Sequence, residues 1–323
     1  MKIGIVSNSA TLYMPLLPPL SNYKAKAGLM LYVGSSAAPE NSAPETIRYC
    51  NAAGIGLTFE HNKADLYDWL QQHDIVFFSG YGHFVKAQYL EQLPLGAYNI
   101  HFGVLPQFRG PSPVFWQLRK GGHEIGLAIH VLTDQLDGGP VIWRQNIPNQ
   151  PHYNYDNIYQ LFGQLQVQGV LAILNGINSG NKLPLTEQNK SLAVYYPRPE
   201  LKDVFINWQE MDAAEVMDII KACSPWNIGA ISLINGQELK IMDASIGLIN
   251  HYSYPSGTII VNKRTFAVMC KGERLLNINF FKMGNNYVPA RFAGAYGFKS
   301  GQSFVSNTPN LAPTTAKTNP NLT

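Results

Sequence analysis

Short apolar runs recur along the first hundred residues, and the stretches between them are long enough to hold helices. The runs lie at residues 2–7, 28–33, 55–60, 74–79 and 97–101. The expected crossover helices lie at residues 44–53, 64–72 and 88–93. Because strands joined by helical crossovers form a parallel sheet, the pattern predicts a doubly wound α/β fold.

The hydrophobic pattern changes after residue 124. Apolar residues alternate with small or polar ones from Ile125 to Val131, which predicts a strand, and residues 140–147 are its expected partner. From Tyr155 to Ile177 the apolar residues recur with a period close to that of a helix. We therefore expect a long amphipathic helix to close a first domain that covers residues 1–182.

The second half of the chain follows a polar stretch with Gly and Pro, and we assign residues 183–203 as a linker. A helix is expected at 212–222, and short strands are expected at 231–245, 257–261, 265–270 and 275–281. Short strands with frequent turns favour a small barrel or sandwich, here over residues 204–305. Residues 306–323 are rich in Asn, Thr and Pro, which predicts a disordered tail.

The composition is that of a globular protein without a membrane span. Charged residues make up 14% of the 323 residues and hydrophobic residues 46%. No apolar run approaches the length of about 18 residues that a bilayer requires, and the first residues do not resemble a secretion signal. We expect a cytoplasmic protein with no membrane partner. The oligomeric state is not indicated.

Neither the cysteines nor the net charge points to a special class of protein. The three cysteines are far apart, so neither a disulfide framework nor a metal cage is expected. The net charge is +3 with the cations scattered, which neither requires nor forbids a nucleic-acid partner.

Two polar residues stand at the end of the fifth predicted strand. Asn99 and His101 are two positions apart, so their side chains share one face at the edge where open α/β sheets bind ligands. Ser112 and Pro113 have the pattern of a helix start, which predicts a short, fixed loop before them. Taken alone, such a pair is more often a capping histidine and a turn-forming asparagine than a catalytic pair.

A polar loop follows at residues 133–141 and carries Asp134 and Asp137. A carboxylate beside glycines is usually part of a turn. If Asp137 reaches His101, however, it would orient the imidazole and favour its protonated form, as acid–base catalysis requires. His130 has no ligating neighbours at metal-site spacing, and we expect it to pack against the surface of its strand.

The segment NIHFGVLPQFRG and the later segment LTDQLDGG closely resemble formyltransferases that use 10-formyltetrahydrofolate. That family has the pattern Asn-x-His-x-Ser-Leu-Leu-Pro-x-x-Arg-Gly, followed by a loop that ends in Asp-x-Gly. Residues 205–208, 224–226 and 255–259 resemble the C-terminal domain of methionyl-tRNA formyltransferases and related amino-sugar formyltransferases. The resemblance implies a Rossmann-like catalytic domain followed by an OB-like barrel.

The resemblance also implies the chemistry. Asn99, His101 and Asp137 match the catalytic residues of the family, in which an amine attacks the formyl carbon of the folate co-substrate. Asn99 and a protonated His101 would stabilise the oxyanion, and His101 would move the proton that the amine loses. No metal and no covalent intermediate are required. The folate contacts implied by the resemblance are His83, Phe84, Val85, Leu105, Thr133, Asp134 and Leu136.

Two departures from the family pattern bear on the substrate. Gly103 stands where the family usually has Ser, which we interpret as a tuning change. The segment from Gly34 to Thr46 has two Glu and no Lys or Arg, whereas methionyl-tRNA formyltransferases carry a Gly/Arg/Lys-rich insertion there. Because cations hold phosphate backbones, a small amine such as a nucleotide-linked amino sugar is favoured over tRNA.

Other functions were weighed against this one. Methionyl-tRNA formylation stays an alternative in which cations of the C-terminal domain hold the tRNA. A non-catalytic paralogue that binds folate or RNA conflicts with the presence of Asn99, His101 and Asp137. Hydrolysis of the folate by water is disfavoured by Asn99. A nicotinamide-dependent dehydrogenase is excluded because no G-x-G-x-x-G turn follows the first strand.

Overall fold

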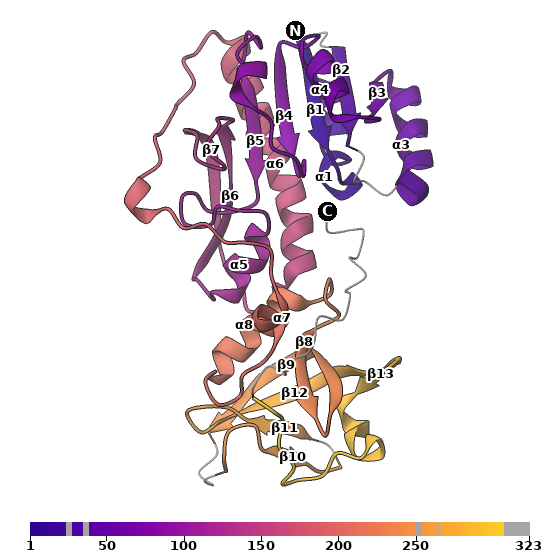
Figure 1. The fold of residues 1–323 in the computed structure, drawn as a ribbon, viewed down its shortest axis with the longest axis vertical. Helices are drawn as coiled ribbons and strands as arrows, with labels where there is room; N and C mark the ends of the chain where they lie inside the picture. Colours follow the sequence, from indigo (N-terminus) through magenta and orange to yellow (C-terminus); the bar gives the residue numbers. More distant parts are fainter. Residues whose placement is uncertain (24–27, 35–38, 250–253, 264, 307–323) are drawn as a thin grey trace.

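A computed structural model describes residues 1–23, 28–34, 39–249, 254–263 and 265–306. Two sheets of different kind form two units, one above the other in Figure 1. The predicted disordered tail lies outside the described residues except for Ser306, and the domain limits at residues 182 and 204 stay predictions.

The first sheet has seven strands in the order β3-β2-β1-β4-β5-β6-β7. They are β1 (Lys2–Ser7), β2 (Gly28–Val33), β3 (Gly56–Phe59), β4 (Ile75–Ser79), β5 (Ala97–His101), β6 (Glu124–Val131) and β7 (Val141–Pro148). Neighbouring strands from β3 to β5 are parallel, whereas β5–β6 and β6–β7 are antiparallel. This arrangement confirms the predicted Rossmann-like α/β class. The arrows of β4 and β5 point toward the second unit in Figure 1.

The helices of the first unit agree with the apolar periodicity where they are long. They are α1 (Ala10–Tyr13), α2 (Leu17–Ser21), α3 (Pro39–Ala53), α4 (Lys63–Leu70), the 3₁₀ turn η1 (Ala87–Tyr89), α5 (Pro113–Arg119) and α6 (Tyr155–Asn178). The long helix α6 starts at a capping box formed by Asn154 and Asn157 and buries Phe162 and Val170. The short helices α1 and α2 escaped prediction because one turn carries no periodic signal.

Two expectations about helix starts were wrong in detail. Helix α3 begins at Pro39 rather than Pro44, so part of the segment Gly34–Thr46 that was expected to be a loop is helical. Pro39 suits the first position of a helix, and Pro44 lies inside α3, beyond its first turn. Ser112 does precede α5, with Pro113 at its start, but the Ser112 side chain makes no capping hydrogen bond.

The second unit is built on an antiparallel sheet in the order β10-β11-β12-β9-β8, with β13 paired to β12. Its elements are α8 (Ala213–Cys223), β8 (Ala230–Ile234), β9 (Gln237–Ile249), β10 (Ile259–Val261), β11 (Phe266–Met269), β12 (Arg274–Met283), β13 (Asn286–Pro289) and η3 (Ala290–Tyr296). The strand predicted at 231–245 is a hairpin, because Asn235 and Gly236 both adopt positive φ, of 49° and 76°. An Asn-Gly pair is the preferred sequence for such a turn.

The linker passes from α6 to the second unit and includes η2 (Lys190–Leu192) and α7 (Leu201–Val204). Aromatic side chains join the two units where α5 meets α8. Trp226 contacts Phe115 and Tyr155 at ring-centroid distances of 5.7 and 5.9 Å. Trp116 stacks on the linker residue Tyr196 at 4.9 Å. The loops that follow β5 are therefore packed between the sheet, the linker and α8.

Candidate active site

The structure brings Asn99, His101 and Asp137 together at the carboxyl end of β5. The first two share a face because they are two residues apart on the strand, and Asp137 reaches them from the β6–β7 loop. His101 Nδ1 lies 3.6 Å from Asp137 Oδ1, and Asn99 Nδ2 donates to the same oxygen at 3.4 Å. The side chains of His101 and Asp137 are only 5% and 9% exposed.

Asp137 is held by its backbone as well as by its partners. Its φ of 48° lies in the left-handed region, which Asp adopts more readily than most residues. A Cβ atom at Gly139 would lie 1.9 Å from the Val131 carbonyl oxygen, so only glycine permits this return of the chain. The second carboxylate oxygen, Oδ2, accepts a hydrogen bond of 2.8 Å from the Gly110 amide. The loop therefore fixes the direction of the carboxylate.

The other nitrogen of His101 is also engaged. Nε2 lies 2.6 Å from the carbonyl oxygen of Phe108, which can only accept, so Nε2 carries the proton. In the neutral imidazole, Nδ1 is then unprotonated and faces Asp137. A Cβ atom at Gly103 would lie 2.8 Å from Nε2 and 2.9 Å from the Phe108 oxygen. Gly103 thus leaves room for this contact, a steric role beyond the missing hydroxyl.

His130 belongs to the same cluster. It is buried on its strand, as expected, but its ring also contacts Asn99 and Asp137. It pairs with Asn99 across the β5–β6 ladder, and its Nε2 lies 3.1 Å from Asn99 Nδ2 and 3.6 Å from Asp137 Oδ1. Its Nδ1 lies 3.0 Å from the Val131 carbonyl oxygen, so Nδ1 is the donor and Nε2 accepts from Asn99. Only the strand register reveals this neighbour, and one sequence does not give the register.

His101 and Asp137 shift each other's pKa. Burial lowers the pKa of His101, and the Asp137 carboxylate opposes this shift without reversing it. Burial alone would raise the pKa of Asp137, but His101, His130 and the Gly110 amide hold it well below its usual range. The cluster therefore combines an ionised carboxylate with a neutral His101. The sequence-based expectation of a protonated imidazole neglected the cost of burying the charge.

The two loops expected to hold folate lie side by side. Asp134 Oδ1 accepts a hydrogen bond of 2.8 Å from the Ala87 amide, which ties the β6–β7 loop to the segment after β4. Phe84 and Leu136 expose 53% and 51% of their surface. The remaining residues expected there differ in position: His83 is half-buried, Thr133 hydrogen-bonds Gln135 within its own loop, and the side chains of Val85 and Leu105 are buried in apolar clusters.

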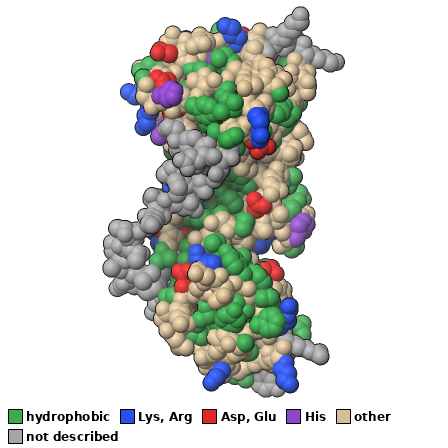
Figure 2. All heavy atoms as spheres, turned by 90° about the vertical axis from the view of Figure 1, so that its right-hand side faces the viewer, with side chains coloured by type: hydrophobic (Ala, Val, Ile, Leu, Met, Phe, Trp, Pro, Cys, Tyr) green, Lys and Arg blue, Asp and Glu red, His purple; other side chains and the backbone are tan. Residues whose placement is uncertain are grey.

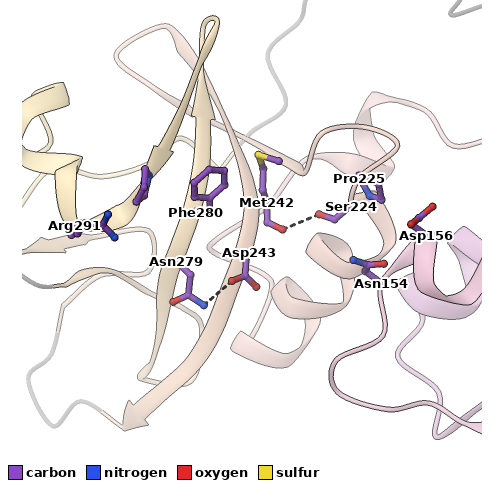
Figure 3. Close-up of a pocket in the computed structure, with 10 residues that line it drawn as sticks. Asn154, Asp156, Ser224, Pro225, Met242, Asp243, Asn279, Phe280 and Arg291 are labelled. Atoms are coloured by element: carbon purple, nitrogen blue, oxygen red, sulfur yellow. Dashed lines mark hydrogen bonds between the residues drawn. The ribbon is translucent and has the colours of Figure 1, made fainter.

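A cleft of the described structure lies elsewhere. It has a volume of about 620 Å³ and opens between the start of α6 and strands β9 and β12, as Figure 3 shows. It is lined mainly by polar side chains, among them Asn154, Asp156, Ser224, Asp243, Asn279 and Arg291. None of the residues predicted for the site lines it. The cleft and the buried cluster of titratable side chains therefore lie in different places, and we assign the candidate site to the buried cluster.

The part of the chain that the structure describes shows neither a cluster of metal-binding side chains nor a membrane-spanning helix. No group of three or more His, Cys, Asp or Glu side chains there is arranged to hold a metal ion. No described helix combines the length and apolarity needed to cross a membrane.

Comparisons with known families match both units. Residues 37–174 match the model of the family described as formyl transferase, and residues 200–292 match that of the formyl transferase C-terminal domain. A methionyl-tRNA formyltransferase of Lactobacillus acidophilus is 28% identical over 208 residues, which is 64% of this chain and 64% of that protein. The corresponding protein of Syntrophomonas wolfei is 29% identical over 217 residues, 67% of this chain and 68% of the relative.

Solved structures share the fold at lower identity. An N-formyltransferase from Helicobacter canadensis, solved with folinic acid and dTDP-3-aminofucose, has a TM-score of 0.65 and 16% identity. The match covers 86% of this chain and 98% of that one. HypX from Aquifex aeolicus has a TM-score of 0.58 and 17% identity, and the match covers 91% of this chain but 48% of HypX.

Proposed function

Because the chain belongs to the formyl transferase family, we propose that it transfers a formyl group from 10-formyltetrahydrofolate to a primary amine. The observation that carries this proposal is the convergence of Asn99, His101 and Asp137 in a buried cluster at the carboxyl edge of the sheet. Buried, mutually perturbed titratable groups are typical of catalytic sites.

The residues divide the work of moving one proton. The attacking amine must lose a proton, and neutral His101 has its unprotonated Nδ1 available as a base. Once protonated, the imidazole lies against the Asp137 carboxylate, which stabilises the positive charge in a buried setting. Asn99 Nδ2 donates to the Asp137 carboxylate and to Nε2 of His130, so the Asn99 amide is fixed beside the reacting groups.

The folate fits the pair of loops joined by Asp134 and Ala87. The exposed side chains of Phe84 and Leu136 offer apolar surface to a pterin ring, and the main chain of residues 83–85 and 133–137 offers hydrogen-bonding groups. When bound there, 10-formyltetrahydrofolate would supply the formyl carbon. As the bond from the amine to that carbon forms, the bond from the carbon to N10 breaks, and His101 gives the proton taken from the amine to N10, so that tetrahydrofolate leaves. The protein supplies the base, the carboxylate and the exclusion of water.

For the acceptor we propose a small amine, most suitably a nucleotide-linked amino sugar. The segment 34–46 contains no Lys or Arg, and Lys and Arg side chains are scattered over the face seen in Figure 2. A long polyanion such as tRNA requires several clustered cations. The fold is also shared, over most of both chains, with an enzyme solved together with dTDP-3-aminofucose.

Methionyl-tRNA is the second candidate, because the curated relatives that cover about two thirds of this chain carry that name. A side-by-side assay separates the two acceptors. Wild-type protein is supplied with 10-formyltetrahydrofolate and with either a dTDP-linked amino sugar or initiator Met-tRNA, at low and moderate salt. We expect faster formylation of the sugar with little salt dependence. Efficient formylation of the tRNA that falls steeply with salt would instead establish the second candidate.

A further inference from the structure

We propose that Gln188, a residue of the interdomain linker, is a positioning residue for the Asp137 carboxylate. Its side-chain amide donates to the Asp137 carbonyl oxygen at 2.8 Å and to the Gly139 carbonyl oxygen at 2.7 Å. Its Oε1 accepts from Arg109 Nε and Nη2 at 3.2 and 2.7 Å. One carboxamide thus links the linker, the β6–β7 loop and the loop after β5. The inference rests on the proposed function, in which Asp137 acts on His101.

The chemistry of this position suits glutamine specifically. Both amide hydrogens serve carbonyl oxygens, and the carbonyl oxygen serves a guanidinium, so the donors and the acceptor are all used in their proper direction. Arg109 is buried, and a buried charge needs hydrogen-bond partners. A glutamate could still bind Arg109, but it has no hydrogen to give to the carbonyl oxygens of Asp137 and Gly139.

The carboxamide is presented by a linker that is itself fixed through its backbone. Before Gln188, Thr186 exchanges two hydrogen bonds of 2.8 Å with Val141 at the start of β7. After it, the Val194 carbonyl oxygen accepts a hydrogen bond of 3.0 Å from the Arg109 amide, and the Tyr196 amide donates one of 2.9 Å to the Arg109 carbonyl oxygen. Gln188 therefore lies between two anchored points. A fixed donor pair constrains the loop more than a free side chain would.

The linker also supports the other end of Asp137. Gly110, whose amide holds Asp137 Oδ2, has a φ of 114°, and a Cβ atom there would lie 2.0 Å from the Tyr196 oxygen. The chain after β5 therefore passes so close to the linker that only glycine fits. The carboxylate is directed through Gly110, and the Asp137 backbone is held through Gln188. Both supports depend on the linker.

The test compares three variants of the linker in the full-length protein. Gln188→Leu removes all four hydrogen bonds, and Gln188→Glu keeps the acceptor for Arg109 while it removes the two donations. Asn189→Ala is the matched control, because Asn189 is exposed and caps only the η2 turn through Ser191. For each variant, kcat, the KM of both substrates, the pH dependence of kcat/KM and the thermal unfolding midpoint are measured.

We expect both Gln188 variants to lower kcat by about tenfold to a hundredfold with nearly unchanged KM, because a small displacement of Asp137 disturbs its contact with His101. The acid limb of kcat/KM should also move to lower pH, since a displaced carboxylate supports the imidazolium less. Asn189→Ala should retain the wild-type values.

Wild-type kcat and pH dependence in Gln188→Glu would overturn the inference, because the contact with Arg109 would then suffice. An equal loss in Asn189→Ala would also overturn it, by showing a general effect of linker stability. Asp137→Asn is assayed alongside. If Asp137→Asn retains full activity, the proposed function of the cluster fails; if it loses activity while both Gln188 variants keep theirs, only the positioning role fails.

Discussion

Two polar regions of the molecule differ in the burial and the contacts of their polar side chains. In the cluster at the end of β5, His101, His130 and Asp137 are buried, and one ring nitrogen of each histidine lies 3.6 Å from Asp137 Oδ1. In the cleft of Figure 3, Asp243 and Asn279 are exposed and share one hydrogen bond of 3.1 Å. The cleft is open to solvent, whereas the buried cluster holds the coupled charges.

The difference follows from the surroundings of the charges. Water and salt screen an exposed carboxylate, so its neighbours perturb it little. A buried carboxylate beside an imidazole interacts strongly, and both groups change their proton affinity. A hollow alone therefore does not locate the chemistry of this protein. The buried side chains that change one another's proton affinity indicate where the chemistry takes place.

The largest expected effect comes from removing the base of the buried cluster. His101→Ala should lower kcat for formyl transfer by a factor on the order of 10³. Asp243→Asn in the cleft should leave kcat unchanged, because Asp243 is exposed and its carboxylate accepts a hydrogen bond from Asn279 rather than from a residue of the buried cluster. Steady-state formylation of the amino sugar measures both. A large loss in Asp243→Asn with an active His101→Ala would move the chemistry to the cleft.

A smaller effect is expected where the cluster is tightly packed. In Gly103→Ser the new Cβ lies too close to His101 Nε2 and to the Phe108 oxygen, so the imidazole must move and lose that hydrogen bond. We expect kcat to fall by about tenfold, consistent with the loss of one buried hydrogen bond. Gly103→Ala, which adds the Cβ without the hydroxyl, should behave alike.

Kinetics of the two Gly103 variants, with nitrogen NMR shifts of the His101 ring, measure this effect. An unchanged ring tautomer and unchanged kcat in both variants would show that the cluster accommodates the extra carbon, and that Gly103 plays no part in holding the imidazole.

Much of the fold is legible in the sequence because long elements carry repeated signals. Strands such as β1 and β4 and the helix α6 follow from apolar periodicity. The one-turn helices α1 and α2 have no such repeat. The Asn-Gly pair at residues 235 and 236 does indicate a hairpin turn. It was overlooked because apolar residues alternate on both sides of it, as in a single strand.

The candidate site was predictable only in part. The spacing of Asn99 and His101 places them on one face of a strand, whereas Asp137 was only a loop carboxylate that could reach His101 until the family resemblance implied its catalytic role. His130 and Gln188 were missed because their contacts depend on strand register and on the path of the linker. The net lowering of the His101 pKa was not predicted, because desolvation depends on burial that a sequence does not reveal.

The central claim is that the proton moves through the pair of His101 and Asp137, and the pH dependence of kcat/KM in wild-type and Asp137→Asn protein tests it most directly. Asparagine tolerates the positive φ at this position, so the change removes mainly the charge. His101 must be unprotonated to act, so activity should fall as the pH drops through its pKa. Burial places that acid limb below the ordinary histidine value of about 6.5.

The Asp137 carboxylate opposes the effect of burial, so its removal lowers the pKa of His101 further. The account therefore predicts a reduced kcat/KM in Asp137→Asn, with its acid limb at lower pH than in the wild type. An acid limb that stays in place or moves to higher pH would contradict it.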